Sequence, residues 1–465
     1  MKLAVLGAGP GGYVAAIRAA QLGAEVTVVE KSEVGGTCLN WGCIPTKTLI
    51  ASCELLAAAR KSESFGIDIR GEILPNISKM MERKNRVVET LVKGIRALFK
   101  SRGITIIEGE GTLTSPHEMS VALRSGETRN LLFDRLIIAT GSRPREIASA
   151  KFDAVSIISS EDALGLSVIP KSIVIIGAGI IGCEYANIFG SVGSEVTLIE
   201  KLPRVLATED TEISALFERE LKKRKIKLRT NTVVEKVGVR AGGIYVSLPG
   251  GEEVVAEKAL VAVGRDFNTN GIGLEAAGVA KAASGEIKVN RAMETNIPGI
   301  YAVGDVTGGM MLAHVASRQG IIAARNIMGK NDKIDYTSVP SAIFTSPEIA
   351  SVGLREFETA EKGIKVRVGH FPFRLLGKAH AIGEIEGIVK IISDFKSDRI
   401  LGVHIMGPRA SDLIHEATLA IRKGLKTKDI SETIHAHPTL SEALKEAAED
   451  VHGEAIHLGA GEVLK

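Results

Sequence analysis

The stretch LAVLGAGPGG, residues 3–12, decides the fold of this chain. It joins an apolar strand to a glycine loop, and an Ala-rich helix and a second strand ending at Glu30 follow. This is the order of a βαβ unit that binds a dinucleotide: Gly7 permits the tight turn, Gly9 lets the backbone approach a pyrophosphate, and Gly12 lets the helix pack on the strand. We expect the helix N-terminus to hold the phosphates and Glu30 to accept ribose hydroxyls.

The same pattern occurs again, offset by 170 residues. Gly177, Gly179 and Gly182 repeat the spacing of the first glycine loop, and Glu200 follows the next strand as Glu30 follows the first. A single glycine fingerprint is a weak signal, but two with identical spacing and an acid at the same place are a strong one. The sequence therefore predicts two Rossmann-like dinucleotide-binding domains.

A pair of cysteines lies directly after the first unit, in the stretch GTCLNWGCIPTK, residues 36–47. In an ideal α-helix the Cα atoms of Cys38 and Cys43 would lie roughly 8 to 9 Å apart, and a disulfide needs less than about 7 Å. If the pair bonds, the backbone must tighten, and Gly42 supplies the freedom while Pro45 suits a first helical turn. A helix start favours the thiolate, and a strained bridge is easier to reduce, so we expect a redox pair.

Two nucleotide sites and a dithiol predict that electrons pass among three centres. A nicotinamide gives up a hydride, whereas a disulfide opens by attack on sulfur. An intermediary that handles both is required, and a flavin has that chemistry. The sequence therefore predicts a flavin between a nicotinamide and the cysteine pair.

Apolar runs that end in glycine recur at residues 136–141, 260–264 and 300–305. The third ends in Asp305, an acid that suits a cofactor polyol or ribose, and it follows the second nucleotide unit. We therefore expect the first domain to be discontinuous and to resume near residue 270. From residue 338 the pattern changes to strands and helices without a glycine fingerprint, which indicates a separate domain.

The last candidate for chemistry is His437, with Glu442 five residues later. A thiol with an ordinary pKa near 8.5 needs a base to become a nucleophile at neutral pH, and a histidine oriented by a carboxylate is the usual one. A histidine near a helix start is more often structural. The dithiol elsewhere in the chain, without another obvious base, favours the catalytic interpretation.

Bulk properties exclude several classes of protein. The 465 residues predict roughly three domains, and the net charge of +3 indicates no acidic partner. The densest basic run, residues 222–225, lies beside Glu218 and Glu220, so we expect a solvated helix face rather than a nucleic-acid site. Four cysteines argue against a secreted disulfide framework and favour a reducing compartment, the cytoplasm, with Cys53 and Cys183 in the core. No apolar run is long enough to span a membrane, and no metal site is indicated.

With these pieces in place, the chain resembles the pyridine nucleotide–disulfide oxidoreductases over essentially its whole length. The matching stretches occur in the family's order and comprise residues 30–47, 138–141, the second fingerprint through Glu184, 301–305 and 437–442. The resemblance implies an α/β fold with an FAD and an NAD domain plus a C-terminal α+β dimerisation domain. The boundaries we predict are 1–142 (FAD), 143–269 (NAD), 270–340 (completing the FAD domain) and 341–465 (dimerisation).

The resemblance also implies cofactor contacts and roles for individual residues. FAD would be held by the first fingerprint, and NAD by the second with Gly264. Additional FAD contacts would come from Thr37, Lys47, Gly111, Asp305 and Ala313. Cys38 matches the thiol that meets the substrate, and Cys43 matches the thiol against the flavin. Lys47 resembles the lysine near the flavin nitrogen, with Glu184 as its ion-pair partner.

The reaction implied is the NAD-dependent oxidation of protein-bound dihydrolipoyl groups to lipoyl, through a Cys38–Cys43 disulfide and FAD. In this family the His437–Glu442 dyad crosses to the Cys38 of the other subunit, which implies a homodimer. The implied partner is the lipoyl domain of a 2-oxoacid dehydrogenase complex or the glycine cleavage carrier protein. Because the chain begins at its first strand, we expect no fused lipoyl domain and a partner supplied in trans.

Three alternatives were weighed against this reaction. A glutathione reductase using NADPH typically has Tyr where Ile180 stands, and Glu200 would repel a 2′-phosphate, although Lys201 and Arg204 leave the choice of nucleotide open. A mercuric reductase would carry a C-terminal cysteine pair, which residues 461–465 lack. A catalytically idle scaffold is disfavoured because both redox cysteines and the histidine are present.

Overall fold

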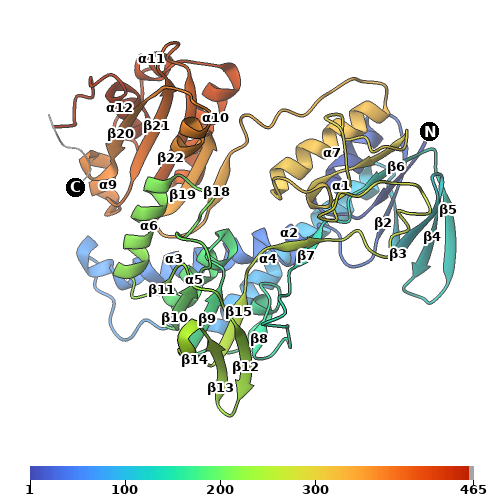
Figure 1. The fold of residues 1–465 in the computed structure, drawn as a ribbon, viewed down its shortest axis with the longest axis horizontal. Coiled ribbons are helices and arrows are strands. Elements are labelled where there is room, and N and C mark those ends of the chain that lie inside the picture. Colours follow the sequence, from blue (N-terminus) through green and yellow to red (C-terminus); the bar gives the residue numbers. More distant parts are fainter. Residues whose placement is uncertain (460–465) are drawn as a thin grey trace.

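The computed structural model describes residues 1–459 and shows an α/β fold of three regions arranged around helices α3 and α5 (Figure 1). The tail at residues 461–465, used above against a mercuric reductase, lies outside the described residues. Within residues 1–459, no helix combines the length and the apolar character needed to cross a membrane.

The first region is a seven-stranded sheet in the order β17-β6-β1-β2-β3-β4-β5. Its strands from β17 to β3 are parallel, and β4 and β5 extend the long β3 as an antiparallel ribbon. The strands are β1 (Lys2–Leu6), β2 (Glu25–Glu30), β3 (Thr105–Ser115), β4 (Glu118–Leu123), β5 (Thr128–Leu132), β6 (Arg135–Ile138) and β17 (Ile300–Ala302).

Both faces of this parallel sheet are buried, which explains the continuous apolar run at its centre. Leu3 and Val5 pack into one core cluster, and Ala4 and Leu6 into the cluster on the other face. The first cluster also holds the apolar sides of two helices, α1 (Pro10–Gln21) and α7 (Ala313–Ile327). These helices cross so closely that a Cβ on Gly320 would lie 2.3 Å from the carbonyl oxygen of Gly11.

Strand β17 pairs with β6, so the chain returns to the first sheet after the second nucleotide unit, as the sequence predicts. Between the two regions the chain passes out along β7 (Ser142–Pro144) and back along β16 (Arg265–Phe267), which pair antiparallel. The other helices of the first region are α2 (Gly36–Asn40), α3 (Cys43–Arg60) and α4 (Ile77–Ser101). The expected boundaries at 142, 269 and 340 stay predictions.

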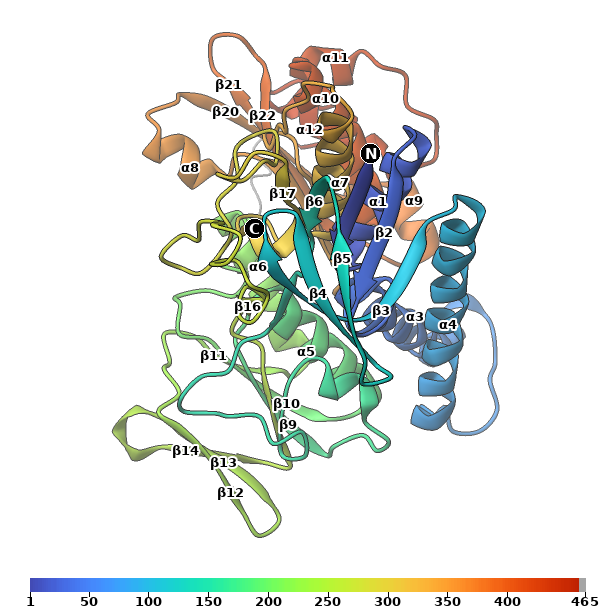
Figure 2. The same cartoon turned by 90° about the vertical axis from the view of Figure 1, so that its right-hand side faces the viewer.

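The second region repeats the design of the first. Its parallel sheet has the order β11-β10-β9-β15-β8, and a three-stranded ribbon, β12-β13-β14, projects from it at the bottom of Figure 2. The helices are α5 (Ile180–Val192) and α6 (Thr211–Lys223). The strands are β8 (Ile157–Ile158), β9 (Ser172–Ile176), β10 (Glu195–Ile199), β11 (Lys227–Arg229), β12 (Lys236–Arg240), β13 (Gly243–Ser247), β14 (Glu253–Ala256) and β15 (Lys258–Val261).

The basic run at the end of α6 is mostly the helix face that the sequence predicts. Lys222 pairs with Glu218 and Lys223 with Glu220 on the helix surface. Arg224 differs, because it donates to the buried Asn187 at 2.7 Å. Cys53 and Cys183 are both buried, as expected of small core residues.

The third region is an antiparallel sheet in the order β18-β19-β22-β21-β20 with helices packed against it. Its strands are β18 (Ser341–Ile343), β19 (Glu348–Gly353), β20 (Val366–Pro372), β21 (Ile388–Asp394) and β22 (Ile400–Gly407). Its helices are α8 (Glu356–Glu361), α9 (Gly377–Ile382), α10 (Ala410–Lys423), α11 (Thr427–Ser431) and α12 (Glu442–Asp450). One core cluster joins all three regions, because it contains Leu49 of α3, Ile188 of α5 and Ile343 of β18.

Candidate active site

The redox cysteines lie on either side of a break between two helices. Cys38 is in α2, and Cys43 is the first residue of α3. Gly42 between them has φ −140° and ψ −110°, a conformation that is neither helical nor extended, and a Cβ there would lie 3.0 Å from the carbonyl oxygen of Thr37. The backbone therefore tightens at Gly42, as the sequence predicts for a pair that must approach. Both sulfurs are free thiols, half-buried, and hydrogen-bonded to each other.

The two thiols have opposite acidities. The hydrogen bond from Cys38 and the charge of Lys47 lower the pKa of Cys43 to about 7, although burial and Glu184 oppose this. The pKa of Cys38 is raised well above its usual value, first by sharing its proton with Cys43 and then by burial. The first proton lost from the pair therefore leaves a thiolate on Cys43.

Lys47 of the first region is held in place by groups from the second and third regions. Its Nζ lies 2.8 and 2.9 Å from the two carboxylate oxygens of Glu184, which is buried on α5. The same ammonium sits 4.5 Å from the centre of the Phe344 ring, and the Phe344 N–H donates to Glu184 Oε1 at 3.1 Å. The structure thus brings together the predicted Lys47–Glu184 pair and adds Phe344, which follows β18.

The two glycine loops have the same backbone geometry. Gly7 and Gly177 both have φ +101°, and a Cβ at either would come within 2.5 Å of a carbonyl oxygen of the adjacent strand end. A Cβ on Gly12 or Gly182 would lie 2.0 or 1.9 Å from the oxygen of that same loop glycine. These positions admit only glycine, so the turn and the helix packing of a dinucleotide site are both present.

The acids that end β2 and β10 are also equivalent. Glu30 accepts from the N–H of Ala8 at 2.7 Å, and Glu200 accepts from the N–H of Ala178 at the same distance. Each carboxylate is fixed at the rim of its loop, where it can also accept a ribose hydroxyl. Both sites therefore fit a dinucleotide, with the phosphates at the N-termini of α1 and α5.

The redox helix α2 begins against the first of these loops. A Cβ on Gly36 would lie 2.6 Å from the Cα of Gly9, and the N–H of Gly35 donates to the carbonyl of Ala8 at 2.8 Å. A dinucleotide held by the first loop is therefore the one adjacent to the cysteine pair. That position is the one expected for FAD, with NAD in the second loop.

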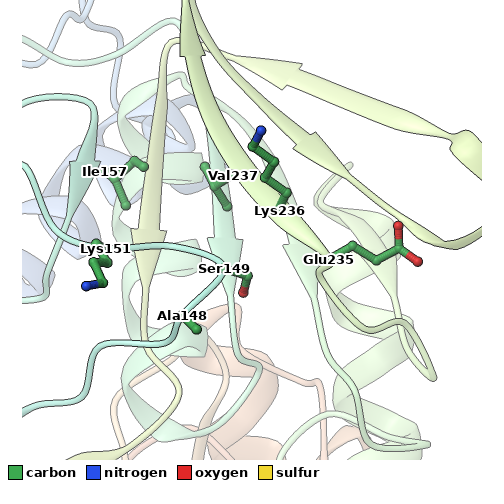
Figure 3. A pocket seen from close by; sticks show the side chains of 7 residues that line it. All are labelled: Ala148, Ser149, Lys151, Ile157, Glu235, Lys236 and Val237. Atoms are coloured by element: carbon green, nitrogen blue, oxygen red, sulfur yellow. The ribbon is translucent and has the colours of Figure 1, made fainter.

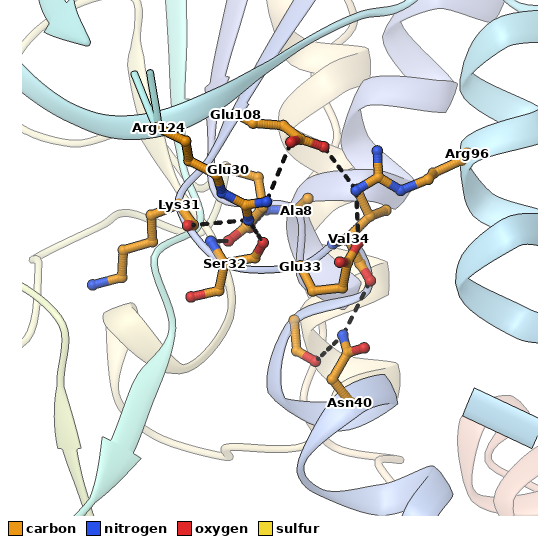
Figure 4. Close-up of polar contacts among 11 residues, drawn as sticks. Ala8, Glu30, Lys31, Ser32, Glu33, Val34, Asn40, Arg96, Glu108 and Arg124 are labelled. Carbon is orange, nitrogen blue, oxygen red and sulfur yellow. Dashed lines mark hydrogen bonds and ion pairs between the residues drawn. The ribbon is translucent and has the colours of Figure 1, made fainter. Parts of the chain in front are cut away.

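An ionic clamp fixes the turn between Glu30 and α2 (Figure 4). Arg96 of α4 reaches Glu33 at 2.7 Å and Glu108 at 2.9 Å. Arg124 reaches Glu108 at 3.2 Å and also donates to backbone carbonyls of this turn. The clamp ties β3 and α4 to the segment that joins the ribose acid to the redox helix.

The other predicted cofactor residues are placed as follows. Asp305 accepts from Ser142 at 2.5 Å beside the crossing of the two regions. Ala313 is the first residue of α7. Gly111 lies in β3, where a Cβ would lie 2.7 Å from the end of the Leu6 side chain. Gly264 has φ +119° between β15 and β16. Their contacts with FAD or NAD stay predictions.

His437 faces solvent in this chain. Its side chain is 76% exposed, and its Nδ1 lies 2.9 Å from Glu442 Oε1. Glu442 is further fixed by the N–H of Thr439, and although burial opposes it, these contacts lower the pKa of the carboxyl. The two side chains of the dyad are thus in contact. Because Nδ1 of the His437 ring faces Glu442, Nε2 on the other side of the ring is directed away from that carboxylate.

The hollow in Figure 3 lies elsewhere and carries none of this chemistry. It encloses about 680 Å³ between the segment at residues 148–151 and β12. Its lining consists of Ala148, Ser149, Lys151, Ile157, Glu235, Lys236 and Val237. None of these side chains contacts the cysteine pair or the Lys47–Glu184 pair in the hydrogen bonds and ion pairs of residues 1–459.

Sequence reasoning missed Phe344. A lone aromatic residue near the start of a domain has no motif, and its role depends on which strand end meets Lys47. A cis Ser346–Pro347 bond follows two residues later, but no local pattern points back to the lysine.

This fold and site define an enzyme that exchanges electrons between a cysteine pair and two dinucleotides. The chain belongs to the pyridine nucleotide-disulphide oxidoreductase family, whose pattern matches residues 1–320, and the family's dimerisation domain matches residues 339–448. FAD and NAD are the cofactors of this family. The dimerisation domain supports a homodimer.

Similar proteins include two curated dihydrolipoyl dehydrogenases. That of Chlamydia muridarum is 45% identical over 96% of this chain and 95% of its own length. That of Bacillus subtilis is 44% identical over 97% and 98%. Among solved structures, LpdA from Mycobacterium tuberculosis superposes with a TM-score of 0.91 at 28% identity, covering 97% of this chain and 99% of that chain.

Proposed function

We propose that this enzyme oxidises dihydrolipoyl groups carried on a partner protein to lipoyl, with NAD⁺ as the final acceptor. The observation that carries the proposal is the cysteine pair beside the first nucleotide loop, on a chain similar over its full length to dihydrolipoyl dehydrogenases. Glu200 supports NAD⁺, because a carboxylate at the ribose repels a 2′-phosphate. The glutathione reductase alternative has no comparable support.

In the proposed reaction the chain first acts as acceptor in a thiol exchange. His437 of the partner subunit takes the proton of one substrate thiol, and Glu442 stabilises the imidazolium. The substrate thiolate attacks Sγ of Cys38 in the Cys38–Cys43 disulfide, so the S–S bond breaks and Cys43 leaves as a thiolate. The lowered pKa of Cys43 makes it the better leaving group of the two sulfurs.

A second exchange completes the oxidation. The other substrate thiol, deprotonated in turn, attacks the substrate sulfur of the mixed disulfide and closes the lipoyl ring. Cys38 is released as a thiolate, and the cysteine pair now holds the two electrons. The first glycine loop and Glu30 would hold FAD, which would supply the two-electron chemistry that links the reduced cysteine pair to NAD⁺. The charge of Lys47 lowers the pKa of Cys43 and so favours its thiolate.

The partner we propose is a lipoyl domain of a 2-oxoacid dehydrogenase complex or the glycine cleavage carrier protein, and the compartment is the cytoplasm. Four cysteines, two of them buried and unpaired, fit a reducing environment. A homodimer would bring the exposed His437–Glu442 dyad to the half-buried Cys38 of the other subunit.

Steady-state kinetics of the purified holoenzyme test the proposal. We expect turnover of dihydrolipoamide with NAD⁺ to exceed turnover of glutathione disulfide with NADPH by at least about a hundredfold. The reverse preference would overturn the proposed substrate. Reductive titration tests the electron path, because a long-wavelength absorbance lost in Cys43→Ser would place that sulfur on the flavin, and its absence in the wild type would refute the assignment.

A further inference from the structure

The Lys47–Glu184 pair acts on Cys43 with two opposite signs. The positive charge of Lys47 lowers the pKa of the Cys43 thiol, and the negative charge of Glu184 raises it. The net field at the sulfur therefore depends on how firmly the ammonium and the carboxylate are held. A group that fixes both side chains therefore affects the pKa of the Cys43 thiol without contacting the sulfur.

Phe344 contacts both members of this pair, in two different ways. Its backbone N–H donates to Glu184 Oε1 at 3.1 Å, the same oxygen that lies 2.8 Å from Lys47 Nζ. Its ring faces the ammonium at 4.5 Å from the ring centre. The ring therefore covers one side of the Lys47 cation.

Phe344 is itself anchored in the core cluster that joins the three regions. Phe344 is partly buried and packs against this cluster, whose members include buried residues of α3, α5 and the sheet of the third region. Ile343, the preceding residue, is the last residue of β18 and is buried. The ring position is thus set by the dimerisation domain, whereas Lys47 and Glu184 belong to the two nucleotide regions.

We propose that Phe344 is a positioning residue for the redox centre: its ring and backbone hold the Lys47–Glu184 pair, so that the dimerisation domain sets the charge beside Cys43. The inference deepens the proposed function and rests on it only for the assignment of Cys43 as the flavin-side sulfur. The polar and cation contacts of Phe344 are with Lys47 and Glu184, so its effect on Cys43 is exerted through that pair.

The test compares Phe344→Leu and Phe344→Met with Phe344→Tyr. The first two remove the aromatic face and keep the backbone N–H, and Met also keeps a side chain of similar length should Leu fold poorly. Tyr keeps the ring. A partly exposed cation–π contact changes an equilibrium by about two- to fivefold. We therefore expect the pH midpoint of Cys43 ionisation to rise by about half a pH unit in the Leu and Met variants. In the Tyr variant the midpoint should stay at the wild-type value.

The midpoint is read in two ways from the holoenzyme. One is the long-wavelength absorbance against pH after reduction with one equivalent of dithionite, which supplies two electrons. The other is the rate against pH at which iodoacetamide alkylates Cys43 in a Cys38→Ala background, measured without reductant. Neither uses a dihydrolipoyl substrate, so the outcome is independent of the substrate assignment. With substrate, we expect kcat to fall about two- to fivefold in Leu and Met while the KM for dihydrolipoamide is unchanged.

Phe357→Leu is the matched control. Phe357 also belongs to the dimerisation domain and also lies over a cation of the NAD region, Arg204, at 5.2 Å, but it is not in contact with the redox pair. An equal shift of the Cys43 midpoint in this control would show that loosened docking alone is responsible and would overturn the proposal. An unchanged midpoint in both Phe344→Leu and Phe344→Met, or a shifted midpoint in Phe344→Tyr, would also overturn it.

Discussion

Lys390 joins the NAD region to the dimerisation domain through a buried cluster of charges. Its side chain is 2% exposed on β21, and its Nζ lies 2.9 Å from Asp210, 3.1 Å from Glu212 and 2.7 Å from Glu356. Asp210 is 1% exposed and caps the N-terminus of α6. Replacing Lys390 by Met keeps the length of the side chain but leaves the Asp210 carboxylate without its cation.

The loss of unfolding free energy in Lys390→Met depends on how many hydrogen bonds the Asp210 carboxylate keeps. Removing one partner of a fully buried ion pair costs about 3 to 5 kcal/mol. Asp210 would keep two N–H donors, those of Glu212 and Glu356, each at 3.1 Å. Glu356 is half exposed and can turn to water. We therefore expect the low end of that range, a loss of about 3 kcal/mol in the free energy of unfolding. For a chain of this size this corresponds to a fall in melting temperature of about 5 °C.

The destabilisation should depend on pH in a defined direction. Burial disfavours the charged form of Asp210, but the interaction with His404 and the hydrogen bond and charge of Lys390 outweigh it and lower the pKa of the carboxyl. A lowered native pKa stabilises the fold above the unfolded pKa of about 3.9, and this contribution is lost as the pH falls through the native value. In Lys390→Met the native pKa rises, so the difference from wild type is largest at neutral pH and shrinks toward pH 4.

Thermal unfolding of the holoenzyme, followed by circular dichroism between pH 4 and pH 8, measures both effects. Lys428→Met is the control, because Lys428 and Glu432 form an ion pair in the same domain with side chains 70% and 68% exposed, and such a pair contributes about 0 to 1 kcal/mol. Equal melting temperatures for Lys390→Met and wild type at pH 7.5, or a difference that grows as the pH falls, would refute the reasoning.

Three further outcomes are expected. Cys38→Ala removes the hydrogen bond that contributes most to acidifying Cys43, so the midpoint of Cys43 alkylation should rise from about 7, and an unchanged midpoint would contradict the assigned bond. Glu200→Ala removes the acceptor fixed at the second loop, so the KM for NAD⁺ should rise about tenfold or more, and steady-state kinetics that show no loss of selectivity against NADP⁺ would count against that role. Gly94 lies within α4 and has open space around an added Cβ. In Gly94→Ala the melting temperature should therefore rise, with a gain of about 0.5 to 1 kcal/mol in the free energy of unfolding. A fall in melting temperature would mean that this face of α4 is covered.

Much of the fold and half of the site follow from local sequence patterns. The glycine spacing at Gly7 and Gly177 predicts two βαβ units because those backbone conformations exclude a Cβ, and the structure has both with the same φ. The bend between Cys38 and Cys43 is likewise predicted, because a disulfide cannot span a regular helix over that step. Such features depend on a few residues in one stretch of chain.

Other features depend on contacts between segments far apart in the chain. Glu184 is recognisable from its place in the second fingerprint by family resemblance, but its distance to Lys47 across 137 residues is set by the packing of α5 on α3. The Lys390 cluster has no motif at all, since its carboxylates come from α6 and α8 and matter only because burial removes water from them.

The sequence by itself determined two dinucleotide units, a redox cysteine pair and a histidine–carboxylate dyad, because each is written within a short segment whose geometry is local. Lys47 follows Cys43 by four residues on α3, but tertiary structure decided how the Glu184 carboxylate and the Phe344 ring meet that lysine. A strand end of the dimerisation domain brings Phe344 to Lys47 and Glu184, and the short distances in a half-buried site make those charges effective where solvent would otherwise screen them.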